Sequence, residues 1–232
     1  MEVIILAGGY GTRISEYTKR IPKPLIKIGK HPILYHIIMI YKKHGFNNFI
    51  VALGYKGNLI KRYFKKYKNL KIKFINTGLR TMTGGRLRRL KKYLSPNTNF
   101  MLTYGDGVSN VNLKKLLKFH NKNNNLVTVT AVKPPARFGA LTLRGNKVIQ
   151  FREKLDKDSG WINGGFFVMS YNFLKYIKGD NTYLEKSPLQ IVAKIKKLAA
   201  FKHRGFWQCM DTKRDMDKLN QLAILKKIPW LI

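Results

Sequence analysis

Short apolar runs alternate with amphipathic stretches through the first half of the chain, and this rhythm predicts strands that alternate with helices. Val3–Ala7 is a continuous apolar run of the kind found in buried strands. The predicted strands are Val3–Ala7, Phe49–Leu53, Lys71–Ile75 and Asn99–Tyr104, and the predicted helices are His31–His44, Asn58–Tyr67, Gly85–Leu94 and Asn112–Asn121. We therefore expect an α/β fold with a doubly wound, mostly parallel sheet.

The pattern changes near Leu126, where the segments become richer in strand-forming residues. Leu126–Val132 and Ile162–Met169 are predicted strands, and Leu141–Phe151 is a predicted hairpin that turns at Gly145-Asn146. The spacing of Thr182 and Glu185 is typical of a capping box and predicts a helix from Thr182 to about Lys196. A last helix is predicted from near Thr212 to about Lys226. Because no linker or repeat interrupts the chain, we expect one domain over residues 1–232.

The net charge of +35 comes from 46 basic and 11 acidic residues. A charge of this size is typical of proteins that bind nucleic acid or anionic membranes. However, lysines outnumber arginines 34 to 12 and are scattered over the whole chain, whereas nucleic-acid readers rely on arginine for bidentate contacts. We interpret the charge as a general bias toward lysine and expect no specific nucleic-acid partner. A basic surface would still attract phosphorylated substrates.

The remaining composition predicts a cytoplasmic protein without a membrane partner. No apolar run approaches the ~20 residues that span a bilayer, and the short apolar start carries Glu2 rather than basic residues, which favours a first strand over a signal peptide. Cys209 is the chain's one cysteine, so no internal disulfide can form, which fits a reducing compartment.

A glycine-rich loop follows the first predicted strand in the sequence Leu6-Ala7-Gly8-Gly9-Tyr10-Gly11-Thr12-Arg13. Glycines after a buried strand let backbone N–H groups approach an anion closely, and Arg13 supplies a cation suited to phosphate. The loop lacks the third glycine of the dinucleotide fingerprint and the Gly-Lys-Ser/Thr of a Walker A loop. A simple tight turn is the alternative interpretation, and the adjoining Thr12-Arg13 favours phosphate binding.

Lys23 stands between two prolines in Ile21-Pro22-Lys23-Pro24-Leu25. The prolines restrict the backbone and prevent a regular helix there. A lysine held close to a phosphate loop can neutralise charge that develops at a transferring phosphorus. A solvated lysine in a turn is the alternative in a chain so rich in lysine.

Two aspartates are candidate metal ligands. Asp106 follows the predicted strand that ends at Tyr104, and the carboxyl ends of parallel strands are where open α/β sheets bind ligands. Mg²⁺ often takes one or two carboxylates and fills its other positions with phosphate and water. Asp211 precedes Thr212 and Asp215, so its carboxylate could serve the start of a helix or could fold back onto the same metal. Spacing alone leaves both interpretations open.

Taken together, these motifs resemble the sugar nucleotidyltransferase family, and in particular its glucose-1-phosphate cytidylyltransferase branch. The resemblance runs over nearly the whole chain. Its motifs are ILAGGYGTR, PKPL, HPILYHI, GYKG, TMTGGRL, TYGDGV, PPARFGAL, INGGFFV, GFWQCMDT and the closing PW. The first two are typical of the superfamily, and TMTGGRL, RFGAL and GFWQCMDT point to the cytidylyl branch.

The resemblance implies a doubly wound, Rossmann-like fold that transfers the cytidylyl group of CTP to α-D-glucose 1-phosphate, with CDP-glucose and pyrophosphate as products. It implies a nucleotide-binding half in residues 1–125 and a sugar-phosphate-binding half, with a small β-rich acceptor subsite, in residues 126–232. Arg13, Lys23 and Asp106 would be catalytic, and Asp106 and Asp211 would hold Mg²⁺. The implied substrate-binding residues are Leu6, Ala7, Gly8, Gly9, Tyr10, Gly11, Thr12, Arg13, Lys23, Thr81, Arg86, Gly105, Glu153, Lys154, Asn163 and Gly165.

One departure from the family concerns Lys68–Asn76, which is shorter than the corresponding segment of the cytidylyl branch. Any subunit contact made by that segment, and therefore any homo-oligomer built on it, is in question. The alternatives to a cytidylyltransferase are the same reaction with UTP or dTTP, a non-catalytic nucleotide-sugar sensor, and a basic nucleic-acid binder. A sensor predicts loss of Arg13, Lys23 or Asp106, and all three are present.

Overall fold

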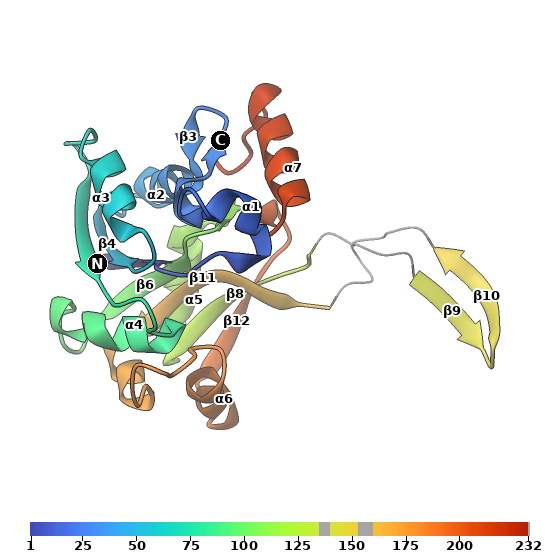
Figure 1. The fold of residues 1–232 in the computed structure, drawn as a ribbon. Helices are drawn as coiled ribbons and strands as arrows, with labels where there is room; N and C mark the ends of the chain where they lie inside the picture. Colours follow the sequence, from blue (N-terminus) through green and yellow to red (C-terminus); the bar gives the residue numbers. More distant parts are fainter. Residues whose placement is uncertain (135–139, 153–159, 232) are drawn as a thin grey trace.

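A computed structural model describes residues 1–134, 140–152 and 160–231 of the protein. Its centre is a seven-stranded sheet in the order β12-β8-β11-β6-β1-β4-β5 (Figure 1). The strands are β1 (Glu2–Ala7), β4 (Asn48–Leu53), β5 (Lys71–Asn76), β6 (Asn99–Tyr104), β8 (Val127–Val132), β11 (Ile162–Ser170) and β12 (Leu198–His203).

The sheet is mostly parallel. The pairs β6–β1, β1–β4, β4–β5 and β8–β12 are parallel, and β11 is antiparallel to both of its neighbours, β6 and β8. The predicted α/β fold class is therefore confirmed. The strand order also shows that residues from both halves of the chain share this sheet, because β11 joins β8 and β12 to the strands of the first half.

Helices cover both faces of the sheet (Figure 1). They are α1 (Ser15–Thr18), α2 (Ile33–Lys43), α3 (Gly57–Phe64), α4 (Thr83–Leu90), α5 (Leu113–Lys122), α6 (Ser187–Lys194) and α7 (Lys213–Ile224). Short 3₁₀ turns lie at Thr12–Ile14, Lys23–Leu25, Lys91–Tyr93 and Tyr171–Tyr176. Within the described part of the chain, no helix has the length and apolar character needed to cross a bilayer.

The apolar run of β1 is explained by burial on both faces. Val3 and Ile5 belong to a core shared with α2, α3, α5 and α7, whereas Ile4 and Leu6 belong to a second core shared with α4 and α6. Side chains of a strand alternate between its faces, so a strand between two helical layers needs apolar residues at successive positions. Burial of these side chains contributes roughly 25 cal/mol per Å² of apolar surface removed from water.

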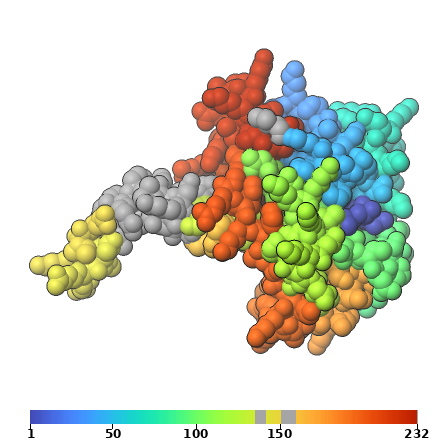
Figure 2. All heavy atoms as spheres, turned by 180° about the vertical axis from the view of Figure 1, so that it is seen from behind, coloured from blue at the N-terminus to red at the C-terminus, as the bar shows by residue number. Residues whose placement is uncertain are grey.

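In the described part of the chain, three two-stranded sheets accompany the central sheet. They pair β2 (Lys27–Ile28) with β3 (His31–Pro32), β7 (Gly107–Ser109) with β13 (Trp207–Cys209), and β9 (Ala140–Arg144) with β10 (Lys147–Arg152). The β9–β10 pair is the predicted hairpin, with Gly145 at φ 58° in its turn. It lies apart from the central sheet in both views (Figure 2).

The helix predicted from Thr182 to about Lys196 is present, but its predicted start is wrong. Helix α6 begins at Ser187, and Thr182 and Glu185 do not form a capping box. The carbonyls of Asp180 and Thr182 instead accept hydrogen bonds from the backbone N–H groups of Met82 and Gly84, at 2.9 Å each. These contacts with the start of α4 hold the segment before α6 in turns, so tertiary bonding overrides the local helix signal.

Candidate active site

A cleft of about 2140 Å³ opens at the carboxyl ends of β1 and β6. Because these parallel strands end at the same edge of the sheet, residues 8–13 and residues 105–107, which follow them, lie side by side. The other walls come from residues 79–86, 162–166 and 207–212. Ligands of open α/β sheets bind at this edge, which makes the cleft the candidate active site.

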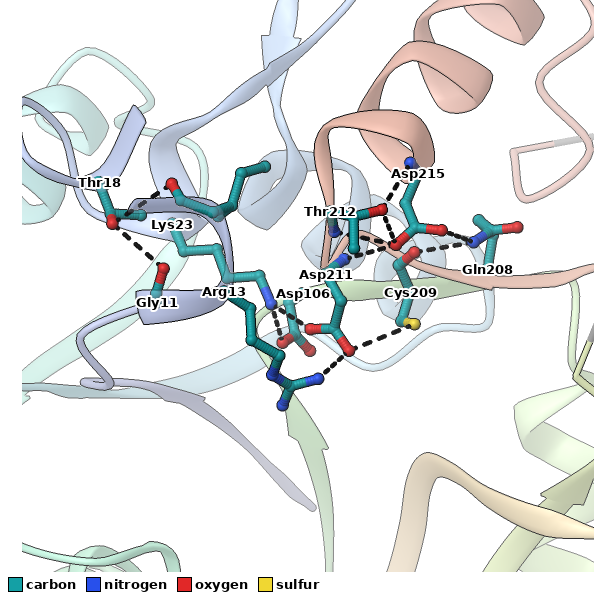
Figure 3. A network of polar contacts seen from close by, with 11 residues as sticks. Gly11, Arg13, Thr18, Lys23, Asp106, Gln208, Cys209, Asp211, Thr212 and Asp215 are labelled. Carbon is teal, nitrogen blue, oxygen red and sulfur yellow. Dashed lines mark hydrogen bonds and ion pairs between the residues drawn. The ribbon is translucent and has the colours of Figure 1, made fainter. Parts of the chain in front are cut away.

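Most residues proposed from the sequence line this cleft. They are Leu6, Ala7, Gly8, Gly9, Tyr10, Gly11, Thr12, Arg13, Lys23, Thr81, Arg86, Gly105, Asp106, Asn163, Gly165 and Asp211. Glu153 and Lys154 lie outside the described residues. Residues 198 positions apart, such as Arg13 and Asp211, therefore meet in one cavity, as the network in Figure 3 illustrates.

The glycine loop turns tightly after β1. Gly11 has φ 68°, a left-handed conformation that favours glycine, and its carbonyl accepts hydrogen bonds from the N–H of Ile14 and from Thr18 Oγ1, both at 3.1 Å. A Cβ on Gly11 would also lie 2.8 Å from the Thr18 methyl group. These contacts hold the loop against the short turn and helix that follow it, and leave its other side open to the cleft.

Arg86 is buried beneath the glycine loop, with 4% of its surface exposed. Its Nη2 donates to the Gly8 carbonyl at 2.9 Å, and its Nη1 donates to Thr77 Oγ1 and the Gly78 carbonyl at 2.7 Å each and to the Leu53 carbonyl at 3.1 Å. Burial lowers the pKa of this guanidinium below its usual value. Arg86 thus braces the loop after β1 against the ends of β4 and β5, in addition to lining the cleft.

Lys23 lies between two carboxylates in the cleft (Figure 3). Its Nζ donates to Asp106 Oδ2 at 2.7 Å and to Asp211 Oδ1 at 2.6 Å. The second oxygen of Asp211 accepts a hydrogen bond from Arg13 Nη1. Only 10% of the Lys23 side chain is exposed, against 73% for Arg13. A buried cation is thus held between two carboxylates, and an exposed cation contacts one of them from the solvent side.

The charges of this cluster reinforce one another. Burial by itself would lower the pKa of Lys23, but the charge and hydrogen bond of Asp106 and those of Asp211 outweigh it, so the pKa lies above the usual value. Burial would raise the pKa of Asp211, and the hydrogen bond and charge of Lys23 outweigh it, so that pKa lies below the usual value. At neutral pH the site therefore holds a charged ammonium beside an ionised Asp211.

Asp211 reaches Asp106 because the chain returns to the site through β13. Strand β13 pairs with β7, which begins directly after Asp106, and the N–H of Met210 donates to the Asp106 carbonyl at 2.8 Å. The start of α7 is capped by Thr212 and Asp215 in a reciprocal capping box. The helix therefore does not need the Asp211 carboxylate, which points to Lys23 and Arg13 instead. Of the two interpretations of Asp211, its contacts favour the site over the helix start.

A second polar group lies along another wall of the cleft. The Asn163 Oδ1 accepts a hydrogen bond from the N–H of Gly165 at 2.8 Å, and its Nδ2 donates to the Tyr104 hydroxyl at 3.4 Å. The Tyr104 hydroxyl in turn donates to Glu185 Oε1 at 2.6 Å. This wall is therefore made of neutral and acidic groups, in contrast to the basic loop and Lys23.

Comparison with known proteins agrees with this geometry. Residues 2–217 match the nucleotidyl transferase family. The chain is 41% identical over 253 residues to the glucose-1-phosphate cytidylyltransferase of Salmonella typhimurium, covering 99% of this chain and 98% of that relative. The chain belongs to the nucleotidyl transferase family. The family resemblance seen in the sequence is thus confirmed.

The chain is also similar to more distant proteins. A mannose-1-phosphate guanyltransferase of Aspergillus oryzae is 28% identical, over 93% of this chain and 62% of that protein. Among solved structures, HddC from Yersinia pseudotuberculosis superposes with a TM-score of 0.76 at 24% identity, covering 96% of this chain and 99% of the other. A structural likeness at this identity supports the nucleotidyl transferase fold alone.

The acidic pair of this nucleotidyl transferase suits a hard divalent cation. Among the described residues, no group of three or more His, Cys, Asp or Glu side chains is placed to hold a metal ion. Asp106 and Asp211 nevertheless both contact one ammonium, so their oxygens converge on the position of a cation. Mg²⁺ needs only one or two carboxylates when substrate phosphates and water complete its shell. The donor set therefore fits magnesium bound together with a nucleotide.

Sequence reasoning missed the part of the site formed by Thr83, Tyr104 and Glu185. All three line the cleft, and both hydroxyl groups donate to the Glu185 carboxylate. In the sequence, Glu185 was interpreted as the last residue of a capping box, so it was not considered as a site residue. The scarcity of acidic residues, 11 in the chain, was the signal that could have drawn attention to it.

Proposed function

We propose that this protein transfers the cytidylyl group of CTP to α-D-glucose 1-phosphate and releases CDP-glucose and pyrophosphate. The observation that carries this proposal is the position of Lys23 between Asp106 and Asp211, beside the glycine loop of the cleft. The 41% identity to glucose-1-phosphate cytidylyltransferase over nearly the full length supports the choice of CTP and glucose 1-phosphate.

The reaction is a displacement at phosphorus. A phosphate oxygen of glucose 1-phosphate forms a bond to the α-phosphorus of CTP, and the bond from that phosphorus to the leaving pyrophosphate breaks. The attacking phosphate is already ionised at neutral pH, so no side chain has to remove a proton. The protein's task is positioning and neutralisation of charge, which is the usual division of labour in phosphoryl transfer.

The glycine loop and two basic residues would bind the phosphates of CTP. The backbone N–H groups of Gly8–Gly11 would approach the triphosphate, and Arg13, whose side chain is 73% exposed, can swing from Asp211 to a phosphate. Lys23 would stabilise the charge that develops at the reacting phosphoryl group. Its pKa above the usual value keeps it charged for that role.

Magnesium is the proposed cofactor. Asp106 and Asp211 would hold it, and when bound it would supply positive charge against the phosphates of the nucleotide. The two carboxylates also keep Lys23 and Arg13 close to that position, so that the cationic groups converge on one part of the cleft.

The remaining site residues would contact either the nucleotide or the sugar. Thr81, Arg86 and Gly105 would lie at the nucleotide, with Arg86 chiefly holding the loop in place. Asn163 and Gly165 would shape the sugar pocket, together with Glu153 and Lys154 from outside the described residues. The division into a nucleotide-binding half in residues 1–125 and a sugar-phosphate half in residues 126–232 is part of this proposal.

The proposed reaction also suggests where the product is used and in which compartment it is made. CDP-glucose made by this reaction would serve as a precursor of deoxysugars in surface polysaccharide, such as the O-antigen of lipopolysaccharide. We place the reaction in the cytoplasm, where CTP is made and where the single thiol of Cys209 would remain reduced. A homo-oligomer is compatible with this function.

The decisive test incubates the protein with glucose 1-phosphate, Mg²⁺ and each of CTP, UTP, dTTP and GTP, and measures pyrophosphate. We expect kcat/KM for CTP to exceed that for UTP at least ~10-fold, because one lost hydrogen bond to the base costs about 1–2 kcal/mol. Equal turnover with UTP or dTTP would overturn the base assignment. Binding of CDP-glucose without turnover of any triphosphate would favour the sensor function instead.

A further inference from the structure

Glu185 is a carboxylate with two hydroxyl donors. The Tyr104 hydroxyl donates to its Oε1 at 2.6 Å, and the Thr83 hydroxyl donates to its Oε2 at 2.7 Å. Glu185 lines the cleft although its side chain belongs to the segment before α6, far from the glycine loop in sequence. Both oxygens are therefore held in fixed positions at the cleft wall.

Both donors are themselves constrained. The Tyr104 hydroxyl accepts a hydrogen bond from Asn163 Nδ2 at 3.4 Å, which directs its own proton to Glu185. Thr83 Oγ1 accepts a hydrogen bond from the N–H of Leu184 at 2.9 Å, which directs its own proton to Glu185. The ring of Tyr104 also packs where a Cβ on Gly165 would come within 2.8 Å. The carboxylate is thus pre-organised by neighbours on α4, β6 and β11.

No lysine or arginine within the described ranges forms an ion pair with Glu185. The ion pairs of the described residues instead involve Asp106, Asp180, Asp211 and Asp217. An ionised carboxylate can accept about four hydrogen bonds, and the two hydroxyls use half of that capacity. What remains can only accept, so the natural ligand of this wall is a hydrogen-bond donor.

The chemistry of the two substrates selects that donor. A phosphate would be repelled by Glu185, whereas the ring hydroxyls of a hexose are neutral donors. The cleft has a different region for each kind of group. The glycine loop and Lys23 form a cationic part that suits phosphate. Glu185, Tyr104 and Asn163 form another wall that suits hydroxyl donors. The acceptor sugar phosphate carries both kinds of group in one molecule.

We propose that Glu185 is a specificity-determining residue that accepts a hydrogen bond from a ring hydroxyl of the acceptor sugar 1-phosphate. Thr83 and Tyr104 are positioning residues that hold the carboxylate for this contact. The inference rests on the proposed function and adds to it a recognition element for the sugar.

A purely structural role makes different predictions. In that role Glu185 only ties the segment before α6 to the start of α4, and its loss would lower stability and affect all sugar substrates alike. A recognition role instead couples Glu185 to one particular hydroxyl. The coupling between a residue and a substrate group is measured by a cycle in which each is removed alone and both are removed together.

The experiment measures kcat/KM with CTP for glucose 1-phosphate and its 2-, 3-, 4- and 6-deoxy analogues, in wild type, Glu185→Ala and Glu185→Gln. We expect wild type to lose at least ~10-fold with one of the analogues, and both variants to lose at least ~10-fold with glucose 1-phosphate. The variants should no longer distinguish that analogue from glucose 1-phosphate, and KM for CTP should stay within about twofold.

Asp180→Asn is the matched control, because Asp180 lies in the same segment but pairs with Arg89 outside the cleft. It should keep the wild-type preference among the analogues. Thermal melting identifies a variant that folds poorly, and the Gln variant then replaces the Ala variant in the cycle. If the Glu185 variants retain the full wild-type discrimination, the inference is wrong although the proposed function stands. If wild type itself releases no pyrophosphate with any sugar 1-phosphate, the proposed function fails first and the inference fails with it.

Discussion

The carbonyl of Gly8 accepts a hydrogen bond from Arg86 Nη2 at 2.9 Å, and a Cβ on Gly8 would lie 2.2 Å from Arg86 Nη1. The glycine is therefore required by a buried guanidinium below the loop as well as by any anion above it. The guanidinium cannot simply move aside, because Leu53, Thr77 and Gly78 also accept its hydrogen bonds. The shape of the glycine loop therefore depends on the buried Arg86 guanidinium.

We predict that Gly8→Ala destabilises the protein by about 1–3 kcal/mol, the usual cost of forcing an extra methyl group into a packed site. Gly9→Ala is the matched control, because a Cβ at Gly9 meets nothing within 4 Å. Urea denaturation of both variants measures the difference. Equal free energies of unfolding for the two would contradict the steric role assigned to Arg86.

Arg86→Met is predicted to lower the free energy of unfolding by more than about 2 kcal/mol, because it leaves several buried oxygen acceptors without a donor. Arg88→Met tests the same change at an exposed position on the same helix and should alter stability by less than about 0.5 kcal/mol. Denaturant titration of wild type and both variants measures the free energies of unfolding. The dependence of that free energy on denaturant concentration should be the same in all three proteins. A loss of nucleotide binding without loss of stability would instead show Arg86 to be a binding residue alone.

Asp211→Asn should lower turnover by two or more orders of magnitude, about 3 kcal/mol of transition-state stabilisation, because it removes charge from the proposed Mg²⁺ site. The melting temperature should change little, since Thr212 and Asp215 cap α7 without Asp211. Thr212→Ala should show the opposite pattern and cost about 0.5–2 kcal/mol of stability.

The double variant of Asp106→Asn and Asp211→Asn adds a check on the shared site. Two ligands of one ion act as a unit, so their combined effect should fall well short of the sum of the single effects. Wild-type turnover of Asp211→Asn at saturating Mg²⁺ would reduce the proposed metal site to Asp106.

Cys209 is predicted to resist alkylation in the folded protein. Burial, and then the charges of Asp211, Asp106 and Asp215, raise the pKa of its thiol to about 12. At pH 9 the thiolate fraction would be about a thousandth, and the thiolate is the reactive species. Iodoacetamide at pH 8 to 9 should modify the protein rapidly only after unfolding.

The raised pKa of the Cys209 thiol also makes the stability of the folded protein depend on pH. The thiol stays protonated in the folded protein while the unfolded thiol ionises near its ordinary pKa of about 8.5, so this group favours unfolding as pH rises above that value. Cys209→Ser should reduce the part of the alkaline loss of stability that comes from this group. Rapid alkylation of the native enzyme at pH 8 would contradict the assigned environment.

Local sequence was sufficient for features that depend on local chemistry. The buried run of β1 follows from apolar residues at successive positions, and the β9–β10 hairpin follows from a Gly-Asn turn between two strand-forming segments. The glycine loop, Lys23 and Asp106 were recognisable because their neighbours in sequence restrict the backbone or end a strand. The resemblance to sugar nucleotidyltransferases rested on the same short motifs.

Tertiary structure decided which distant residues meet. Asp211 and Asp106 are brought together by the pairing of β13 with β7. Turns replace the predicted helix start at Thr182, because residues at the start of α4 donate hydrogen bonds to that segment. The same replacement leaves Glu185 free to receive the hydroxyls of Thr83 and Tyr104. A capping box depends on neighbours within one turn, whereas these contacts depend on packing between elements about a hundred residues apart, whose energy no local pattern contains.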